Sequence, residues 1–381
     1  MRPLPVDIYG EIAENLYNTS SRQTLLSLAL VNKAWSIESQ RVLFRRFCHL
    51  GYTREHQTVY TRIHIRFLEA IISQPKRLGG YVRAYAQCGL AVDQRILKRE
   101  EVQYWTVEIL LWGLTVNALP AMINLKRLTF APTPHRYNSM SFAAEALLRR
   151  CTFQLETLSW RCDGDLSELC TVFLPTQSGL KHLEVGQDPG ETDLSELPED
   201  ACPSLLSVTL WFGSMCHVAE KRNIKALQMH KKLYYRWRPT IPLDCHSSAL
   251  DRLEYLSVWS YKLLRRFMGT NPLNVTLLEL RFWTRNVVLK LSDLPQLRVL
   301  SLLECQDAPD YQELTHGDIA VKCFSRLPTL KIVIIQDRVL SGGMHCHLAI
   351  EYRPDTVWWT VYEDMDSWRP VLDLDIDSTY L

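Results

Sequence analysis

The sequence contains one short run of metal-ligating residue types, His345-Cys346-His347. On a strand the two histidines would share one face and the cysteine would lie on the other, and no second cluster is near in the sequence. A plain edge strand is the favoured interpretation, so we predict no metal site and no cofactor. Motifs of serine hydrolases, phosphate-binding glycine loops and zinc proteases do not occur. We therefore predict no catalytic residues and no enzyme, although a site assembled across the fold from distant residues stays open as an alternative.

A second segment that could do chemistry is 220–238, in which basic residues are interleaved with Tyr234, Tyr235 and Trp237. Such a pattern can bind nucleic acid or phosphorylated peptides, but it is more typical of a solvated helix or a long loop. The whole chain of 381 residues carries 43 Lys and Arg against 42 Asp and Glu, a formal charge of +1. This balance gives no field that would favour nucleic acid or a membrane, so we expect a protein partner.

The eleven cysteines form no C-x-x-C pair, and most lie beside apolar residues. Free cysteine of this kind is typical of a reducing compartment. The first residues carry acidic side chains where a secretory signal would be apolar, and no run of about eighteen apolar residues occurs. The sequence thus predicts a cytoplasmic or nuclear protein.

The first fifty residues predict three short helices. Ile8, Ile12 and Leu16 recur every four residues and form one apolar face. A second helix is expected to run to about Leu30, and a third from residue 33 to residue 47. Three such helices cannot bury all their apolar faces among themselves. The surplus indicates a docking surface.

The residues of this segment resemble an F-box of the type abundant in fungal families. The resemblance rests on the opening Leu4-Pro5, the block LALVNKAW at 28–35, and Leu43-Phe44. It implies binding to the Skp adaptor of a cullin–RING ubiquitin ligase. By position, the residues expected to contact the adaptor are Leu4, Pro5, Ile8, Ile12, Val31, Trp35 and Leu43.

Two positions depart from the F-box pattern without changing its apolar face: Asp7 stands where the family often has glutamate, and Asn32 where cysteine or serine is frequent. One alternative is that the segment is an amphipathic helical cap packed on the rest of the chain. A second is that the protein binds the Skp adaptor as a scaffold without a ligase role, because some F-box proteins work outside ubiquitin ligases.

Beyond residue 120 the chain repeats the phrase L-x-x-L-x-L with conservative changes. Copies start at Leu125, Leu155, Leu180, Leu205, Leu253, Val275, Leu297 and Leu330. The longest step, from 205 to 253, could hold a further copy at Ile224. Each phrase predicts a short strand whose apolar positions face inward, and the residues after it return as a helix or irregular chain.

These phrases resemble leucine-rich repeats, whose periods are 20–29 residues. The Asn or Cys that regular repeats place after the strand occurs in only one of the eight copies, as Cys305. The resemblance therefore implies an irregular solenoid, and an ordinary α/β domain with similar strands is the alternative. Helical returns are expected at 141–151 and 166–173, helices at 63–72 and 102–119, and a first strand near 82–86.

The predicted fold class is α/β, with a three-helix F-box at 1–50 and a leucine-rich-repeat-like solenoid at 51–340. A C-terminal cap and acidic tail are expected at 341–381, with two strands at 345–352 and 356–362. The resemblances imply a substrate-recognition adaptor of a Skp–cullin–F-box ubiquitin ligase, in which the repeats bind an unknown protein target.

Strand alternation suggests where that target would bind. If the fourth and sixth positions of each phrase face the core, the position after the phrase faces the opposite side of the sheet. Tryptophan and arginine are enriched at binding hot spots, so the expected target site is Trp211, Trp259, Arg281 and Trp283. The alternative is that the C-terminal segment or long loops cover these tryptophans.

Overall fold

The computed structural model describes the following residues: 5–18, 22–47, 57–88, 109–131, 150–161, 166–186, 194–210, 218–219, 221–229, 252–268, 273–283, 291, 294–305, 316–337, 346–353 and 356–362. The chain divides into two compact units. Unit 1 comprises Met1–Leu205 and unit 2 comprises Leu206–Leu381. The functional boundaries at residues 50 and 340 stay predictions. No helix in the described part of the chain is long and apolar enough to cross a membrane.

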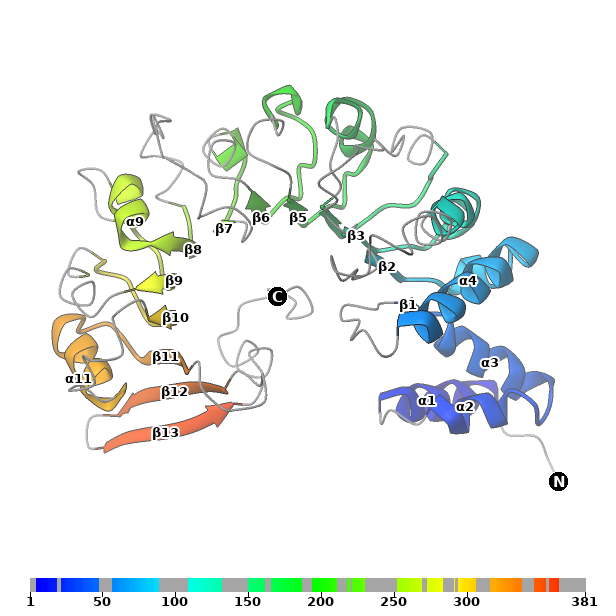
Figure 1. The fold of residues 1–381 in the computed structure, drawn as a ribbon, viewed down its shortest axis with the longest axis horizontal. Helices are drawn as coiled ribbons and strands as arrows, with labels where there is room; N and C mark the ends of the chain where they lie inside the picture. Colours follow the sequence, from blue (N-terminus) through cyan, green and yellow to red (C-terminus); the bar gives the residue numbers. More distant parts are fainter. Residues whose placement is uncertain are drawn as a thin grey trace, which may run out of the picture. The chain divides into compact units, whose positions relative to one another are not determined.

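Unit 1 begins with three helices at the predicted positions: α1 (Val6–Asn18), α2 (Arg22–Leu28) and α3 (Lys33–Leu43). Asn32 caps α3, because its side-chain oxygen accepts a hydrogen bond from the backbone N–H of Trp35 at 3.0 Å. Ala13, Leu25 and Val42 form a small core between the three helices. Figure 1 shows these helices at the N-terminal end of unit 1.

The third helix ends earlier than expected, because Phe47 lies in a strand instead. Strand β1 (Arg46–Phe47) pairs in parallel with β2 (Ala84–Cys88). The carbonyl of Arg45 already accepts hydrogen bonds from the N–H groups of Arg83 and Ala84. The backbone after α3 therefore bonds to the sheet. A further helical turn would leave the N–H groups of Arg83 and Ala84 without this acceptor.

Aromatic stacking joins the three helices to the rest of unit 1. Phe47 stacks on Phe67 of helix α4 (Gln57–Ser73), with ring centroids 4.3 Å apart, and Phe44 stacks on Phe67 at 5.5 Å. The row continues from Phe67 to Tyr85 and then to Phe130 in the next strands. Such ring contacts stabilise the packing of the helices on the strands beyond the effect of the apolar area that they bury, and they favour particular ring orientations.

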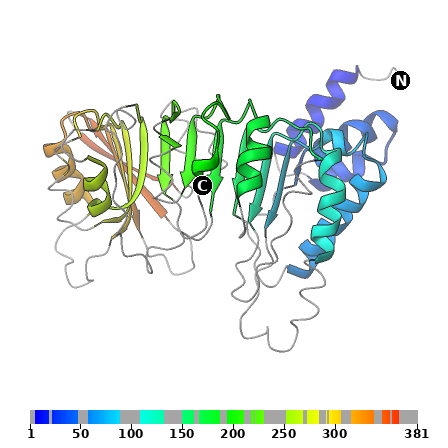
Figure 2. The same ribbon diagram turned by 90° about the horizontal axis from the view of Figure 1, so that it is seen from above.

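The strands of unit 1 pair in parallel in chain order. After β2 come β3 (Arg127–Ala131), β4 (Thr157–Trp160) and β5 (His182–Val185). Leu128 pairs with Leu158, and Leu158 with Leu183, so equivalent positions of the repeated phrase are in register. Figure 2 shows these strands side by side.

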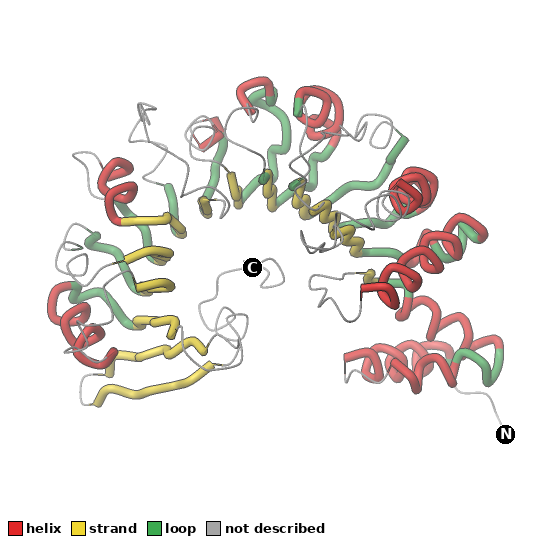
Figure 3. Tube along the Cα trace, in the orientation of Figure 1, coloured by secondary structure: helices red, strands yellow, loops and turns green. Residues whose placement is uncertain are grey.

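The returns between the strands of unit 1 are helical. Figure 3 shows them on one side of the strands. They are α4, η2 (Gly79–Tyr81), residues 109–118, η3 (Leu119–Ala121), the π-helix η4 (Leu169–Phe173), η5 (Leu174–Thr176) and η6 (Leu194–Glu196). The helices predicted at 63–72 and 166–173 are confirmed, as is the described part of that at 102–119. The expected return at 141–151 lies almost wholly outside the described residues. Neighbouring returns pack so closely that a Cβ on Gly79 would collide with the carbonyl oxygen of Ala121. Only glycine fits at this position.

Unit 2 continues the same pattern and closes with antiparallel strands. Its elements are β6 (Ser207–Leu210), β7 (Ala226–Met229), β8 (Tyr255–Ser260), α9 (Tyr261–Met268), β9 (Leu277–Trp283), β10 (Val299–Cys305), α11 (His316–Arg326), β11 (Ile332–Asp337), β12 (Cys346–Arg353) and β13 (Thr356–Tyr362). Strands β6 to β11 pair in parallel, and β12 and β13 are antiparallel. The possible copy at Ile224 is a strand, β7, and the two C-terminal strands are confirmed.

The core of each unit is made by the first, fourth and sixth positions of the phrase. In the phrase that contains β9, for example, Val275, Leu278 and Leu280 are fully buried, and Leu297, Leu300 and Leu302 repeat this in the phrase that contains β10. The fourth and sixth positions of these two strands pair with each other across the sheet. The predicted mixed α/β class is confirmed, and its strands run parallel in chain order within each unit.

Candidate functional site

The three N-terminal helices and the turn between α2 and α3 carry five exposed apolar side chains. They are Ile8, Leu26, Leu30, Val31 and Ile37. Leu30 and Val31 are the most exposed of these, at 88% and 62%, because they lie in the turn between α2 and α3. The small core has no room for them. We call these five residues the apolar patch.

The predicted adaptor-binding residues fall into three groups. Ile8 and Val31 belong to the apolar patch, and Pro5 is also exposed. Ile12, Trp35 and Leu43 are half-buried. Leu4 lies outside the described residues. Sequence reasoning did not include Leu26, Leu30 and Ile37 in the site, although Leu30 stands inside the block LALVNKAW, where the second helix was expected to end.

Two of the half-buried residues hold the helices together. Trp35 packs edge-on against Tyr9 of α1, with ring centroids 4.7 Å apart, and Leu43 packs on the small core. Substituting Trp35 would therefore disturb the packing of α1 on α3 as well as any docking surface. Leu30 and Val31 are better positions than Trp35 for testing binding, because they are exposed and their substitution should disturb the helix packing less.

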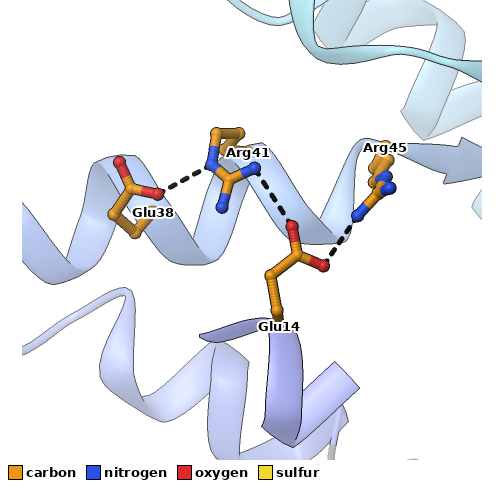
Figure 4. Close-up of polar contacts among 4 residues, drawn as sticks. All are labelled: Glu14, Glu38, Arg41 and Arg45. Atoms are coloured by element: carbon orange, nitrogen blue, oxygen red, sulfur yellow. Dashed lines mark hydrogen bonds and ion pairs between the residues drawn. The ribbon is translucent and has the colours of Figure 1, made fainter. Parts of the chain in front are cut away.

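Ion pairs fix α1 against α3 on another side of the helices. Glu14 accepts hydrogen bonds from Arg41 at 3.1 Å and from Arg45 at 2.7 Å, and Arg41 also pairs with Glu38 at 2.7 Å (Figure 4). Partial burial of Arg41 lowers its pKa, but Glu38 and then Glu14 raise it above its ordinary value. These groups line a shallow hollow with Asp7, Gly10, Glu11 and Asn15. The pairs orient the helices that present the apolar patch.

Two of the four predicted target-binding residues are buried: Trp259 and Trp283 are only 5% and 2% exposed. This agrees with the alternative that these tryptophans are covered, and the target-binding role of the set stays a prediction. The guanidinium of Arg281 lies over the Trp259 ring, 5.7 Å from its centroid. Trp211 lies outside the described residues. The alternation was read correctly, but alternation places a side chain on a face and does not decide whether that face is covered.

A buried polar cluster that sequence reasoning missed lies beside these tryptophans. Glu279 accepts hydrogen bonds from Ser257 at 2.7 Å and from Tyr255 at 3.5 Å, and it pairs with Arg281 at 3.2 Å. Ser257 and Glu279 are registered partners on β8 and β9, at the fifth position of their phrases. That polar fifth position between two leucine-type residues was the available signal.

Unit 1 holds an equivalent cluster in which the serine is buried and the arginine is exposed. Ser159 donates to Glu184 at 2.6 Å, and Arg161 pairs with the same carboxylate at 2.7 Å. Ser159 and Glu184 are registered partners on β4 and β5. The Arg161 side chain is 43% exposed, whereas that of Arg281 is 12% exposed.

Two buried donors lie near the unit 2 cluster without an acceptor in the described part of the chain. They are the Ser301 hydroxyl and the Trp283 indole N–H. Ser301 is the registered partner of Glu279 on β10. A buried donor without an acceptor costs about 1–3 kcal/mol, so these groups indicate a place where another segment could contribute.

The polar groups of the described residues form no metal centre: no three His, Cys, Asp or Glu side chains there gather closely enough to hold an ion. Of the run His345-Cys346-His347, the first residue lies outside the described residues and the other two begin β12. The basic segment 220–238 is described only in part, and its residues 226–229 form β7.

Comparison with known proteins gives no family for this chain. No protein-family model matches the sequence, and no curated protein matches it.

Proposed function

We propose that this protein is a substrate-recognition adaptor of a Skp–cullin–F-box ubiquitin ligase. The single observation that carries the proposal is the exposure of the apolar patch residues, above all of Leu30 and Val31, which are neighbours in one turn. Adjacent apolar side chains with this exposure are suited to be covered by a partner. The resemblance of this segment to an F-box indicates the partner, a Skp-type adaptor.

The remainder of the chain is proposed to be an irregular leucine-rich-repeat-like solenoid that holds a protein target. Support comes from the in-register phrases of β3 to β5 and of β6 to β11, with a return after each strand. Stacked repeats of this kind make extended binding surfaces. In this role the protein catalyses nothing itself and supplies proximity between target and enzyme.

The test is capture of a purified Skp-type adaptor and cullin by the full chain, with dissociation constants measured by calorimetry. A variant with Leu30→Asp and Val31→Asp should bind the adaptor at least about 100-fold more weakly, because two apolar side chains are each worth roughly 1.5 kcal/mol or more when buried. Val321→Asp is the matched control, since Val321 is 53% exposed on α11 and lies in unit 2.

The outcomes separate the alternatives. Loss of adaptor and cullin capture in the double variant, but not in the control, supports the ligase role. Adaptor binding without cullin favours the Skp-binding scaffold. Absence of adaptor binding by the wild-type chain would refute the proposal and leave the three helices as a structural cap.

A further inference from the structure

One face of the unit 1 strands is polar, and no described helix of this unit lies on it. The helical returns lie on the other side of these strands (Figure 3). The polar face, as we call it, is made by the third, fifth and seventh positions of the phrases of β3, β4 and β5. They are Arg127, Thr129, Ala131, Thr157, Ser159, Arg161, His182, Glu184 and Gly186. None of them is phenylalanine, tyrosine or tryptophan, so the face offers mainly hydrogen-bonding groups and charges.

The seventh position of the phrase holds an arginine in both units, but only that of unit 1 is accessible. In unit 2 the guanidinium of Arg281 lies over the ring of Trp259, and the Arg281 side chain is 12% exposed. In unit 1 the Arg161 side chain is 43% exposed. A binding partner can therefore reach Arg161 and not Arg281.

A fixed carboxylate orients the Arg161 guanidinium. Glu184 Oε1 accepts a hydrogen bond from Nε at 2.8 Å and lies 2.7 Å from Nη2, while Ser159 donates to Glu184 Oε2 at 2.6 Å. Glu184 thus occupies the side edge of the guanidinium, which Nε and Nη2 form. The end edge, formed by Nη1 and Nη2, keeps N–H donors without a partner in the described part of the chain.

The end edge of Arg161 is suited to a second carboxylate, because two parallel N–H groups of a guanidinium bind a carboxylate bidentately. A phosphate group carries up to two negative charges, and the nearby Glu184 would repel it more strongly. A nucleic acid binds best to a continuous row of cations with aromatic rings that stack on its bases, and the polar face has Glu184 in its middle. These properties favour an acidic segment of a protein.

Further cations lie where the strands of unit 1 begin. Lys126 and Lys181 stand one residue before β3 and β5. Lys126 pairs with Glu156 at 3.6 Å, whereas Lys181 is exposed and has no acidic partner in the described part of the chain. Arg161 stands five positions further along its phrase than Lys181 does along its own, about 17 Å in an extended strand. An extended peptide of about six residues can therefore bring a carboxylate to each of these two cations.

We propose that the polar face of unit 1 binds an extended acidic segment of the target, with one carboxylate on the end edge of Arg161 and another at Lys181. This inference rests on the proposed function, because it names the class of target that the repeats hold. The polar face does not include the three N-terminal helices, so peptide binding is measured independently of adaptor capture.

The first test measures the binding of labelled peptides to the full chain by fluorescence anisotropy. The probe is a ten-residue peptide in which glutamate alternates with serine, which places all its carboxylates on one side when it is extended. A comparison peptide has glutamine in place of glutamate and should bind at least about tenfold more weakly.

Arg161→Gln should weaken binding of the acidic peptide at least about tenfold, because it removes a charge-assisted pair of hydrogen bonds. Arg298→Gln is the matched control, since it removes an exposed arginine of unit 2 with the same change of charge. It should leave the dissociation constant unchanged. Circular dichroism of both variants checks that the fold is retained.

A second measurement locates the peptide on the wild-type chain. Phenylglyoxal modifies accessible arginines, and mass spectrometry gives the modification rate at each of them. The acidic peptide at saturation should slow the modification of Arg161 several-fold and leave that of Arg298 unchanged.

Three results would overturn the proposal: equal affinities for the acidic and the glutamine peptide, equal weakening by the two arginine variants, or no protection of Arg161. Tighter binding of a ten-nucleotide single-stranded RNA than of the acidic peptide would assign the face to nucleic acid and overturn it as well. A chain that captures the adaptor but not the peptide refutes this inference alone. A chain that binds the peptide but no adaptor refutes the ligase role alone.

Discussion

Units 1 and 2 carry the same polar cluster in two different environments. In unit 1, Ser159 and the exposed Arg161 bind a partly buried Glu184, and in unit 2, Ser257 and the mostly buried Arg281 bind the buried Glu279. Both clusters follow from a serine and a glutamate at registered fifth positions. The repeat therefore determines which side chains meet, and the burial of the glutamate and arginine determines how strongly their interaction contributes.

The largest expected effect comes from removing each carboxylate. Glu279→Ala should lower the free energy of unfolding by about 3 kcal/mol, because it leaves Arg281 buried without its partner. Glu184→Ala should cost about 1 kcal/mol or less, since Arg161 can be solvated. Urea denaturation followed by circular dichroism measures both. Equal losses for the two variants would mean that burial does not distinguish the clusters.

A smaller effect is expected for two serines on neighbouring strands of unit 2. Ser257→Ala removes a 2.7 Å hydrogen bond to the Glu279 carboxylate and should cost about 2 kcal/mol. Ser301→Ala removes a hydroxyl without an acceptor in the described part, and should be neutral or stabilising by up to about 1 kcal/mol. The same denaturation assay applies. A cost for Ser301→Ala as large as that for Ser257→Ala would show that its hydroxyl is satisfied.

The smallest effect concerns one cysteine of each unit, Cys151 and Cys323, for which the two units should behave alike. Burial raises the pKa of Cys323 on α11 to about 12, and burial, opposed by Arg150, raises that of Cys151 to about 12. Because the folded pKa lies above the ordinary value of 9.0, each thiol's contribution to stability is full below pH 9 and is lost as the pH rises toward 12.

Between pH 8 and 9.5 the ionisation of Cys323 should lower the free energy of unfolding by at most about 1 kcal/mol. The Cys323→Ala variant should lack that part of the pH dependence in urea denaturation. At pH 8, alkylation of both thiols should be far slower in the folded chain than in urea. Rapid alkylation of one thiol alone would show that the difference between the units extends to these cysteines.

Much of the fold was predictable because its information is local. The phrase L-x-x-L-x-L places three apolar residues on the same side of a short strand, and this identified every parallel strand from β3 to β11, including β7. Apolar spacing also gave α1 and the start of α3. The strand at Arg46–Phe47 was missed because it exists only through pairing with β2, a contact distant in sequence.

The candidate site was less predictable for the same reason. Alternation placed Trp259 and Trp283 on the side of the sheet opposite to the fourth and sixth positions of the phrases, yet it could not decide whether they are buried. Leu30 was expected only as the end of the second helix, and the turn between α2 and α3 exposes it together with Val31, which was predicted as an adaptor contact.

By itself, the sequence determined the α/β class, the strand positions and the residues that face the core, because apolar periodicity expresses backbone geometry within a few residues. The tertiary structure decided which polar side chains meet, which apolar residues stay exposed at the N-terminal helices and which tryptophans are buried. Those properties depend on pairing and covering between segments far apart in the chain, and no local pattern encodes them.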